Sequence, residues 1–525
     1  MVVTQEATEQ RTPVNAVETA RRVALESPDR PAIISKQGNL TFGELDARTT
    51  QGARAMQRRG IEPGRSFALA CSNRPEFAEA LYSAIKLGLR VTPINWHLTA
   101  EEVAYIVNDC EAKVFFADAR FAATCAEAAK DSPDATVRFT CAGDIDGFES
   151  WDEALAAEST EPLEGIKPGS TMLYTSGTTG RPKGVYRRSQ SRRRSAVARA
   201  MDHRPGEDLH LTTGPLYHAA PLAFSLAGPI TAGIGTVLMD GWNPEECLRL
   251  IDEHKVTHVH MVATMFHRLL SLPDDVRVRY DVSSLRRVVH GAAPTPVHVK
   301  KALIEWLGPI VWEYYAATEG PGATIGPEDW MRKPGSVGKP DVDDHVEIRD
   351  DDGNVLGPNE VGTVWLRSAE NEEARFEYYK DPDKTSRAYT DSRDRFTLGD
   401  MGYLDSDGYL FLTDRTADLI ISGGVNIYPA EVDAVLLTHP AVADACTIGV
   451  PNEEWGEEVK SVVELKDGNE PTPDLAQELI EHCRANTAHY KCPRSIDFTD
   501  RLPRHDTGKI YRRFVREQYR QEAEA

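Results

Sequence analysis

Ten consecutive residues read Thr175-Ser176-Gly177-Thr178-Thr179-Gly180-Arg181-Pro182-Lys183-Gly184, and they are the most informative stretch of the chain. They supply three glycines, four hydroxyls and two cations, which is the composition of a loop that holds phosphates. Glycines let neighbouring N–H groups converge on an anion, hydroxyls add short donors, and the cations add charge. The spacing does not match the G-x-x-x-x-G-K-[ST] pattern of the P-loop. An ordinary surface loop has a similar composition, so the remaining chain must decide between the two interpretations.

Composition narrows the class of protein. A chain of 525 residues predicts two to four domains, and 41% hydrophobic with 27% charged residues is typical of a soluble globular protein. We expect no membrane span and no signal peptide, because long apolar runs and a basic, apolar N-terminus are both missing from the sequence. Eight cysteines without a C-x-x-C pair argue against zinc or a disulfide framework and favour a cytoplasmic location. A net charge of -22 disfavours nucleic acid as a partner, and any nucleotide site therefore needs local cations.

The first half of the chain alternates between helical and strand patterns. Helical spacing covers Glu76–Leu87 and Thr99–Val107, the second opened by a capping box of Thr99 and Glu102. Strand patterns cover Met172–Tyr174, which we expect to be the end of a buried strand, and the segments Leu89–Pro93, Lys113–Ala117, Val256–Val262 and Leu285–Val289. This rhythm predicts βαβ units and parallel sheets. From about Gly335, short strands with Gly/Asp turns predict an antiparallel or barrel-like subdomain, and a small α+β domain follows.

Two small-residue or aromatic clusters follow predicted strands. The run Tyr315-Ala316-Ala317-Thr318-Glu319-Gly320 combines an aromatic face, a hydroxyl and a carboxylate. These groups suit a nucleobase, a phosphate oxygen and Mg²⁺, although a strand-to-loop junction with a solvated glutamate has the same pattern. The run Gly291-Ala292-Ala293-Pro294 would let a planar ligand lie against backbone, but a tight turn would look alike.

Three further sites carry candidate chemistry. Asp400 after Gly399, with Arg415 fifteen residues later, could hold a ribose diol, or it could be an ordinary turn. His218 lies in an apolar loop, where a core histidine and a gate near an acid are the two alternatives. Lys509 follows Gly508 near the C-terminus, where it is either solvated or a mobile charge between two anions.

Taken in order, these motifs resemble the adenylate-forming superfamily of acyl-CoA synthetases, aryl-CoA ligases, peptide-synthetase adenylation domains and firefly luciferase. The resemblance runs from about Thr41 to Lys509, and the stretch 175–184 is highly specific to this family. It implies an α/β fold with a large N-terminal adenylation domain of parallel-rich sheets and a small β-barrel subdomain, residues 1–415. A small, mobile α+β domain, residues 416–525, would carry the catalytic lysine.

The resemblance also implies a role for each motif. Tyr315 would stack on adenine, Thr318 would contact the α-phosphate, and Glu319 with Thr178 would hold Mg²⁺. Lys509 would bridge the substrate carboxylate and the α-phosphate, while His218 would gate the acyl group. The remaining groups would bind ATP and CoA: Thr175, Ser176, Gly177, Thr178, Thr179, Gly180 and Lys183 the β- and γ-phosphates, Gly291, Ala292 and Ala293 the nucleotide, Asp400 and Arg415 the ribose, and Gly423 and Gly424 the pantetheine tunnel.

The reaction implied is an ATP-dependent ligation of a carboxylic acid to CoA through an acyl-adenylate, closest in style to the fatty-acyl-CoA synthetases of lipid metabolism. Three positions depart from the family pattern: Ala316 replaces a glycine, Ala417 stands at the hinge, and Phe396–Asp400 replaces the usual Tyr-Thr-Gly-Asp run. The departure at Ala417 leaves the hinge's polarity undetermined. The methyl group of Ala316 could trim the shape of the acyl pocket without touching catalysis, and the change in Phe396–Asp400 leaves the ribose-binding aspartate intact.

The acid itself is poorly defined by the sequence. Small residues in His218–Pro221 and Ala316–Ala317 suggest a roomy apolar pocket for a fatty, aryl or bulky alicyclic acid, including steroid side-chain acids. A stand-alone ligase that loads a carrier protein and a non-catalytic nucleotide-binding relative are the alternatives, and a homodimer stays open. The arginines Arg187, Arg188, Arg192, Arg193 and Arg194 predict a solvated helix face, with a docking patch for CoA phosphates, a carrier protein or a membrane surface as the alternative.

Overall fold

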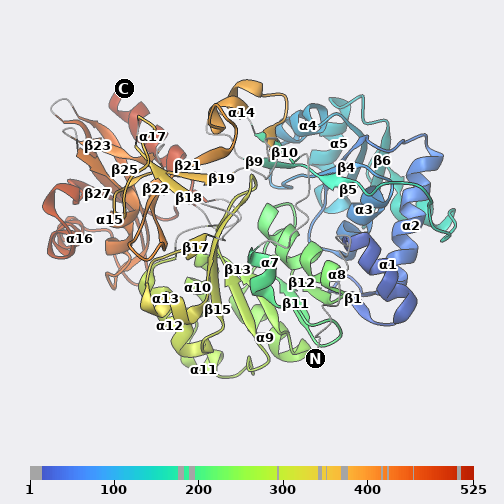
Figure 1. Ribbon diagram of the computed structural model, residues 1–525, viewed down its shortest axis with the longest axis horizontal. Helices are drawn as coiled ribbons and strands as arrows, with labels where there is room; N and C mark the ends of the chain where they lie inside the picture. Colours follow the sequence, from blue (N-terminus) through green and yellow to red (C-terminus); the bar gives the residue numbers. More distant parts are fainter. Residues whose placement is uncertain are drawn as a thin grey trace, which may run out of the picture.

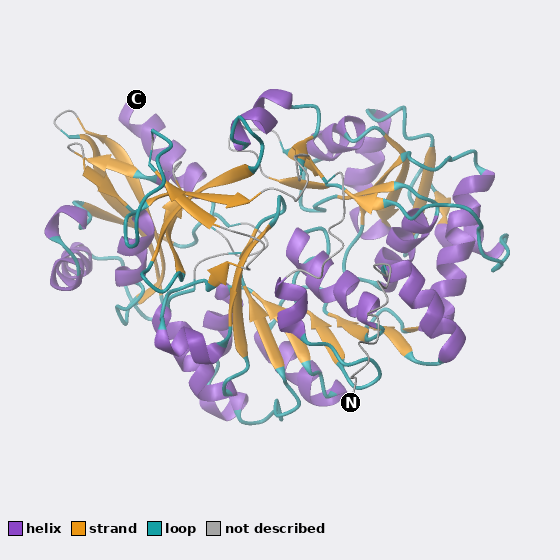
Figure 2. Cartoon of the chain, viewed as in Figure 1, coloured by secondary structure: helices purple, strands orange, loops and turns teal. Residues whose placement is uncertain are grey.

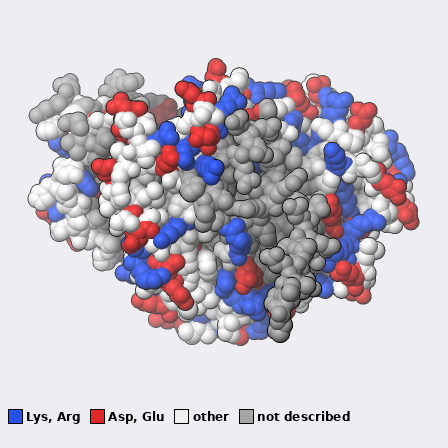
Figure 3. All heavy atoms as spheres, viewed as in Figure 1, with Lys and Arg blue, Asp and Glu red and all other residues white. Residues whose placement is uncertain are grey.

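The computed structural model describes residues 15–175, 182–187, 196–292, 295–340, 346–350, 352–367, 376–415, 418–422, 425–452, 455–504 and 510–524. The chain forms two large α/β bodies, an antiparallel region and a C-terminal body (Figure 1). Helices and strands alternate through the first two bodies, whereas strands dominate the antiparallel region (Figure 2). On the face drawn in Figure 3, acidic and basic side chains lie interspersed despite the net charge of -22.

The first body is a six-stranded parallel sheet in the order β7-β6-β5-β3-β4-β8. Its strands are β3 (Ser66–Ala70), β4 (Arg90–Pro93), β5 (Ala112–Asp118), β6 (Val137–Cys141), β7 (Glu149–Ser150) and β8 (Ser170–Thr171). Its helices are α1 (Ala16–Glu26), α2 (Phe42–Arg58), α3 (Pro75–Lys86), α4 (Ala100–Asp109), α5 (Ala122–Lys130) and α6 (Trp151–Ala156), with a 3₁₀ turn at Ala119–Phe121. Side chains alternate between two cores along β3, because Phe67 and Leu69 join one and Ala68 and Ala70 the other. The predicted capping box of Thr99 and Glu102 opens α4.

The second body is a nine-stranded sheet in the order β17-β16-β15-β14-β13-β11-β12-β1-β2, parallel from β15 to β1. Its strands are β1 (Pro31–Ile34), β2 (Leu40–Thr41), β11 (Leu209–Thr212), β12 (Gly235–Leu238), β13 (His258–Met261), β14 (Arg287–His290), β15 (Val311–Ala316), β16 (Pro321–Ile325) and β17 (Lys339–Pro340). Its helices are α7 (Ala196–Met201), the π-helix η2 (Pro221–Ala227), α8 (Gly228–Ala232), α9 (Pro244–His254), α10 (Ala263–Leu270), α11 (Asp274–Arg277), α12 (Val297–Leu307) and α13 (Pro327–Arg332). The predicted βαβ organisation is therefore confirmed.

Antiparallel strands dominate the rest of the chain. A three-stranded sheet, β20-β10-β9, joins β9 (Leu173–Thr175), β10 (Lys183–Tyr186) and β20 (Glu377–Tyr378), and α14 (Pro382–Ala388) follows it. An open four-stranded sheet, the half-barrel of the fold, contains β18 (Val346–Arg349), β19 (Gly362–Arg367), β21 (Arg395–Leu404) and β22 (Leu410–Arg415). The C-terminal body contains β23 (Ile420–Ser422), β24 (Val425–Ile427), β25 (Val442–Asn452), β26 (Gly456–Leu465), β27 (Ser495–Thr499), α15 (Pro429–Leu436), α16 (Pro473–Asn486), η4 (His489–Lys491) and α17 (Arg512–Glu524).

The strand predicted before the phosphate loop differs from expectation in its surroundings. Met172 is fully buried, but Leu173, Tyr174 and Thr175 of β9 are only partly buried. The reason is that β9 is an end strand of a small antiparallel sheet rather than a strand of the large parallel ones. The loop that follows therefore joins two neighbouring antiparallel strands, β9 and β10.

Candidate functional site

The two ends of the predicted phosphate loop are registered against each other. Thr175 closes β9 and Lys183 opens β10, and the two residues are direct partners in the antiparallel ladder. The loop residues Ser176, Gly177, Thr178, Thr179, Gly180 and Arg181 lie outside the described residues. The Nζ atom of Lys183 lies 3.3 Å from Oδ2 of Asp381, the N-cap residue of α14. The backbone N–H of Lys384 and the ammonium of Lys183 hold the pKa of Asp381 below its usual value.

The residues predicted for adenine and ribose meet in the structure. The Tyr315 hydroxyl donates to Oδ2 of Asp400 over 2.7 Å, and both side chains are buried. Asp400 on β21 is the register partner of Arg415 on β22, so fifteen residues of chain separate two positions that lie side by side. The structure thus brings Tyr315 and Asp400 into contact where the nine-stranded sheet meets the half-barrel, with the backbone of Arg415 in register beside Asp400.

The Thr318-Glu319 pair forms the tip of a tight turn after β15. Two backbone hydrogen bonds between Ala317 and Gly320, of 2.9 and 3.2 Å, close this turn. Oε1 of Glu319 accepts a 2.9 Å hydrogen bond from the hydroxyl of Tyr378, and both side chains are buried. The turn after β15 therefore presents a buried carboxylate whose orientation is set by a residue of another sheet.

Arg187 differs from what the sequence predicts for the arginine cluster. It comes directly after β10 rather than on a helix face, and its Nε donates to the carbonyl of Thr318 over 2.9 Å. A second guanidinium nitrogen also reaches the Thr318 carbonyl. Arg187 thus ties the exit strand of the phosphate loop to the Thr318-Glu319 turn. The other four arginines of the cluster lie outside the described residues.

The small-residue turn after β14 has a backbone that few side chains would permit. A Cβ atom on Gly291 would lie 2.5 Å from the carbonyl oxygen of Tyr314, so only glycine fits. The next residue, Ala292, has a φ of 68°, a left-handed conformation uncommon outside glycine. Ala293 lies outside the described residues. This turn is held flat against β15, one residue away from Tyr315.

The predicted acid-binding loop leads into the π-helix η2. The backbone N–H of Leu222 donates to the carbonyl of His218 over 3.0 Å, so His218 begins this helical segment. π-helical segments are rare and are frequently found at functional sites, and η2 has seven such residues. Ala220 and Phe224 pack in one cluster with Tyr314 and Ala316, which joins the two predicted walls of the acid pocket.

Aromatic and imidazole side chains that the sequence did not predict for this site pack beside these two segments. The ring of Phe224 lies 5.0 Å from that of Tyr314 and 5.7 Å from that of His260. Nε2 of His260 and the Tyr314 hydroxyl are 2.9 Å apart. Burial lowers the pKa of His260 to about 4, so its imidazole is neutral at neutral pH. Alternation along β13 and β15 could have indicated these positions, but only the packing of η2 shows which face they occupy.

Three more predicted site residues, Gly423, Gly424 and Lys509, lie outside the described residues, and so does Ala417, the predicted hinge position. Within the part of the chain that the structure describes, no three His, Cys, Asp or Glu side chains gather as a ready-made metal site. Glu319, the carboxylate that the sequence predicts for Mg²⁺, is among the described residues. Across the same residues, no helix combines the length and apolar character needed to cross a bilayer.

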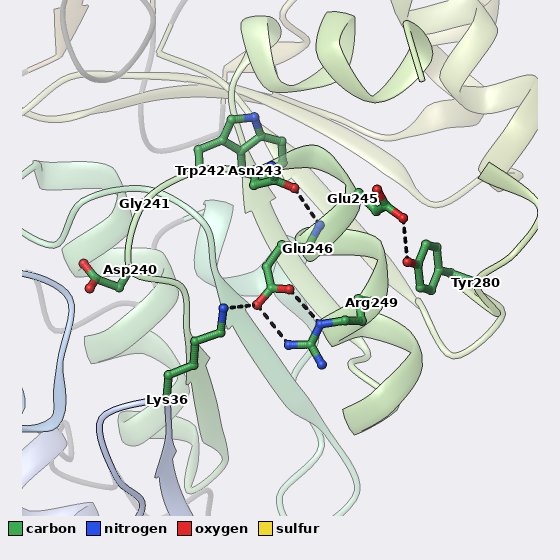
Figure 4. A pocket seen from close by; sticks show the side chains of 9 residues that line it. All are labelled: Lys36, Asp240, Gly241, Trp242, Asn243, Glu245, Glu246, Arg249 and Tyr280. Atoms are coloured by element: carbon green, nitrogen blue, oxygen red, sulfur yellow. Dashed lines mark hydrogen bonds and ion pairs between the residues drawn. The ribbon is translucent and has the colours of Figure 1, made fainter. Parts of the chain in front are cut away.

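A depression of about 610 Å³ lies away from these residues, between the end of β12 and α9 (Figure 4). At its centre, Glu246 pairs with Lys36 at 2.7 Å and with Arg249 at 2.7 Å. These cations, Arg249 foremost, lower the pKa of Glu246 to about 2. Because these charges neutralise one another, they stabilise the start of α9 and give no indication of a catalytic or binding role.

Family models and known proteins match most of the chain. The model of the AMP-binding enzyme family matches residues 20–372, and that of the AMP-binding enzyme C-terminal domain matches residues 431–509. The chain is 34% identical over 490 residues to a 2-succinylbenzoate–CoA ligase of Geobacillus kaustophilus (strain HTA426), covering 93% of this chain and 94% of that protein. It is 33% identical over 509 residues to the long-chain-fatty-acid–CoA ligase FadD13 of Mycobacterium tuberculosis (strain ATCC 25618 / H37Rv), covering 95% and 97%. The crystal structure of the anthranilate CoA ligase AuaEII in complex with anthranoyl-AMP superposes with a TM-score of 0.88 at 25% identity, covering 99% of this chain and 100% of that one.

Proposed function

Because the chain belongs to the AMP-binding enzyme family, we propose that it is an ATP-dependent carboxylic acid–CoA ligase of the AMP-forming type. The single observation that carries the proposal is the contact between Tyr315 and Asp400, with Arg415 in register beside Asp400. The buried Glu319 follows on the same strand and turn as Tyr315. An aromatic ring, a ribose-binding carboxylate and a phosphate-facing turn together make a nucleotide site.

In the first half-reaction, a carboxylate oxygen of the acid attacks the α-phosphorus of ATP. The bond from that phosphorus to the bridging oxygen breaks, pyrophosphate leaves, and an acyl-adenylate forms. Lys183 and the loop from Thr175 would hold the leaving phosphates, while Thr318 would contact the α-phosphate. Lys509 would offset the repulsion between the two anions as they approach.

The residues present also fit Mg²⁺. Mg²⁺ favours one or two protein carboxylates together with substrate phosphate oxygens over a cage made wholly of protein. Glu319, with the hydroxyl of Thr178, would supply such a set. When bound, the ion would neutralise part of the phosphate charge.

In the second half-reaction, the thiol of CoA attacks the acyl carbonyl, loses its proton, and displaces AMP to give the thioester. Gly423 and Gly424 would line the path of the thiol arm. We place the boundary between the adenylation domain, residues 1–415, and the mobile C-terminal domain, residues 416–525, at the end of β22. This position is supported by the change of sheet between β22 and β23. Rotation about Ala417 would exchange Lys509 for the thiol path.

For the acid, we favour an aryl substrate over a fatty or bulky alicyclic one. Phe224, Tyr314 and His260 support this choice, because ring faces and edges pack well against aromatic ligands. His218 would lie nearest the carboxylate. The eight cysteines are all buried free thiols, which supports a cytoplasmic enzyme. A role in fatty acid and lipid metabolism follows only if the long-chain alternative holds.

The test is a panel of carboxylic acids assayed by pyrophosphate release, with thioester formation measured in parallel. We expect ATP- and Mg²⁺-dependent release with aryl acids and thioester formation once CoA is added. Lys509→Ala should abolish adenylation but spare thioester formation from supplied acyl-adenylate. Full adenylation by Lys509→Ala would contradict the mechanism. Acyl-adenylate without thioester would point instead to a carrier-protein acceptor, and sedimentation would test for a homodimer.

A further inference from the structure

Tyr378 lies on β20, the strand that is paired with the exit strand of the phosphate loop. Its register partner is Val185 of β10, and the next residue, Tyr379, donates its N–H to the carbonyl of Gly184 over 2.7 Å. The N–H of Tyr378 in turn donates to the hydroxyl of Thr385 on α14 over 2.9 Å. The backbone of Tyr378 is therefore held from both sides, by a β-ladder and by a helix.

The side chain of Tyr378 is held at both ends as well. Its hydroxyl donates to Oε1 of Glu319 over 2.9 Å in a buried contact. The ammonium of Lys384 lies 4.0 Å from the centre of its ring, within the range of a cation–π contact. Burial lowers the pKa of Lys384, and the charges of Glu319 and Asp381 oppose that effect. Lys384, the Tyr378 ring, its hydroxyl and the Glu319 carboxylate thus form one connected chain.

This chain has a consequence for Glu319. A carboxylate on a turn of four residues can rotate about its own side-chain bonds, and a rotating ligand holds a metal less well than a fixed one. A hydrogen bond to one oxygen fixes the plane of the carboxylate and the direction of the other oxygen. Partners of this kind commonly change metal affinity by 10–100-fold when they are removed.

We propose that Tyr378 is a positioning residue, which orients Glu319 toward the Mg²⁺ that accompanies ATP. The inference rests on the proposed function, in which Glu319 meets that ion. Tyr378 itself does not touch the nucleotide in this proposal. It acts through the Glu319 carboxylate, so its contribution appears when Mg²⁺ and ATP bind together.

The test uses the full chain and measures ATP affinity by calorimetry, once with Mg²⁺ and once with EDTA. Tyr378→Phe keeps the ring and its contact with Lys384 but removes the hydroxyl. We expect the gain in ATP affinity on adding Mg²⁺ to fall about tenfold. In EDTA, ATP affinity should stay within about twofold of the unmodified protein, because the phosphate loop and Asp400 are untouched.

A matched control comes from the same region. The hydroxyl of Tyr389 bonds to the backbone of Phe376, so Tyr389→Phe also removes a buried hydroxyl but leaves the bond to Glu319 in place. This control should keep the full Mg²⁺-dependent gain. Glu319→Gln should lose the gain, and adding Tyr378→Phe to it should cause little further loss, because the two residues act through one carboxylate.

The outcomes separate this inference from the proposed function. A Tyr378→Phe protein that keeps the full Mg²⁺ gain, while Glu319→Gln loses it, overturns the positioning role and leaves the ligase proposal intact. An equal loss in Tyr389→Phe also overturns it, because the loss would then be a general effect of a missing buried hydroxyl. An unmodified protein that binds ATP equally well with and without Mg²⁺ overturns the metal role of Glu319 itself.

Discussion

The two faces of the nine-stranded sheet are built from different side chains. The face toward α9, α10 and α12 is mainly aliphatic, with Leu211, Val259 and Val288 in one large core. The opposite face, toward α7 and η2, places His210, His258, His260 and Tyr314 on the same strands. Parallel sheets covered on both sides usually have hydrophobic residues on both faces.

Three histidines on the η2 face each have a hydrogen-bond partner at one ring nitrogen. His210 contacts the Ser225 hydroxyl at 3.1 Å, His258 contacts the carbonyl of Met201 at 2.7 Å, and His260 contacts Tyr314 at 2.9 Å. The aliphatic face also contains buried polar groups, namely the pair of Lys300 and Glu313 at 2.6 Å and His290, which lies 3.7 Å from Glu313. The difference suggests that one face serves packing while the other serves a ligand, and four experiments test that division.

The largest loss of stability should come from the buried pair of Lys300 and Glu313 on the aliphatic face. Lys300→Met leaves the Glu313 carboxylate buried without its cation, so we expect a loss of about 3–5 kcal/mol in the free energy of unfolding. Burial raises the pKa of Glu313 and lowers that of Lys300, which is the environment in which an unpaired charge costs most. Urea denaturation measures the loss, and adding Glu313→Gln should recover part of it. A loss below about 1 kcal/mol would mean that water reaches the pair.

A pair of truncations compares the two faces directly. Leu303→Ala empties a fully buried site in the aliphatic core and should cost about 3 kcal/mol of stability while leaving the KM for the acid unchanged. Phe224→Ala, on the partly exposed η2 face, should cost less stability and raise the KM for the acid about tenfold. Denaturation gives the stability of both variants, and initial rates at varied concentrations of the carboxylic acid give their KM values. If both variants change the same property, the division between packing and ligand binding is wrong.

The histidines should make stability depend on pH. His260 has a pKa lowered by burial to about 4, whereas an unfolded histidine has a pKa near 6.5. Between these values the unfolded chain binds more protons, so stability should fall as pH falls from about 6.5 toward 4. For His260 this difference should cost about 2 kcal/mol by pH 5.

A variant without a titrating side chain at position 260 tests whether His260 causes this pH dependence. His260→Gln can still accept a hydrogen bond from Tyr314 but carries no charge in this range, so its stability should fall less steeply with pH than that of the unmodified chain. His210, whose pKa burial also lowers, would account for part of the remaining slope. Denaturation midpoints at pH 5, 6 and 7 measure both slopes. Identical slopes would show that His260 does not contribute.

The smallest effect should come from a single hydroxyl on the η2 face. Tyr314→Phe removes the partner of His260 Nε2 and should cost about 1 kcal/mol of stability. An acid with a hydrogen-bonding substituent could replace the lost partner, so added acid should stabilise Tyr314→Phe more than it stabilises the unmodified chain. Thermal unfolding with and without acid tests this point. Equal stabilisation of both proteins by the acid would show that the His260–Tyr314 pair takes no part in acid binding.

Local patterns predicted much of the fold. The capping box of Thr99 and Glu102 opens α4 as expected, and the strands after it pair in parallel as the alternation indicates. The antiparallel strands predicted after about Gly335 were also confirmed. These predictions succeeded because helix capping and hydrophobic periodicity depend on residues that are only a few positions apart in the chain.

The candidate site was predicted in part. The turn with Thr318 and Glu319 follows β15 as expected, and Asp400 lies opposite Arg415. Tyr378, Asp381 and Arg187 were not predicted as parts of this site. Asp381 before Pro382 does signal a helix start, but nothing in that signal connects it with Lys183.

By itself, the sequence determined the type of chemistry, because the phosphate loop and the Tyr315–Glu319 run each keep their functional groups within a few residues. Only the tertiary structure decided which groups hold them in place. Tyr315 and Asp400 are 85 residues apart, Glu319 and Tyr378 are 59 apart, and Arg187 and Thr318 are 131 apart. Such contacts depend on strand register and on how separate sheets pack, and neither leaves a period or spacing in the sequence. The stretch 175–184, together with the motifs that follow it, therefore predicts a nucleotide, while the fold decides which residues orient those motifs.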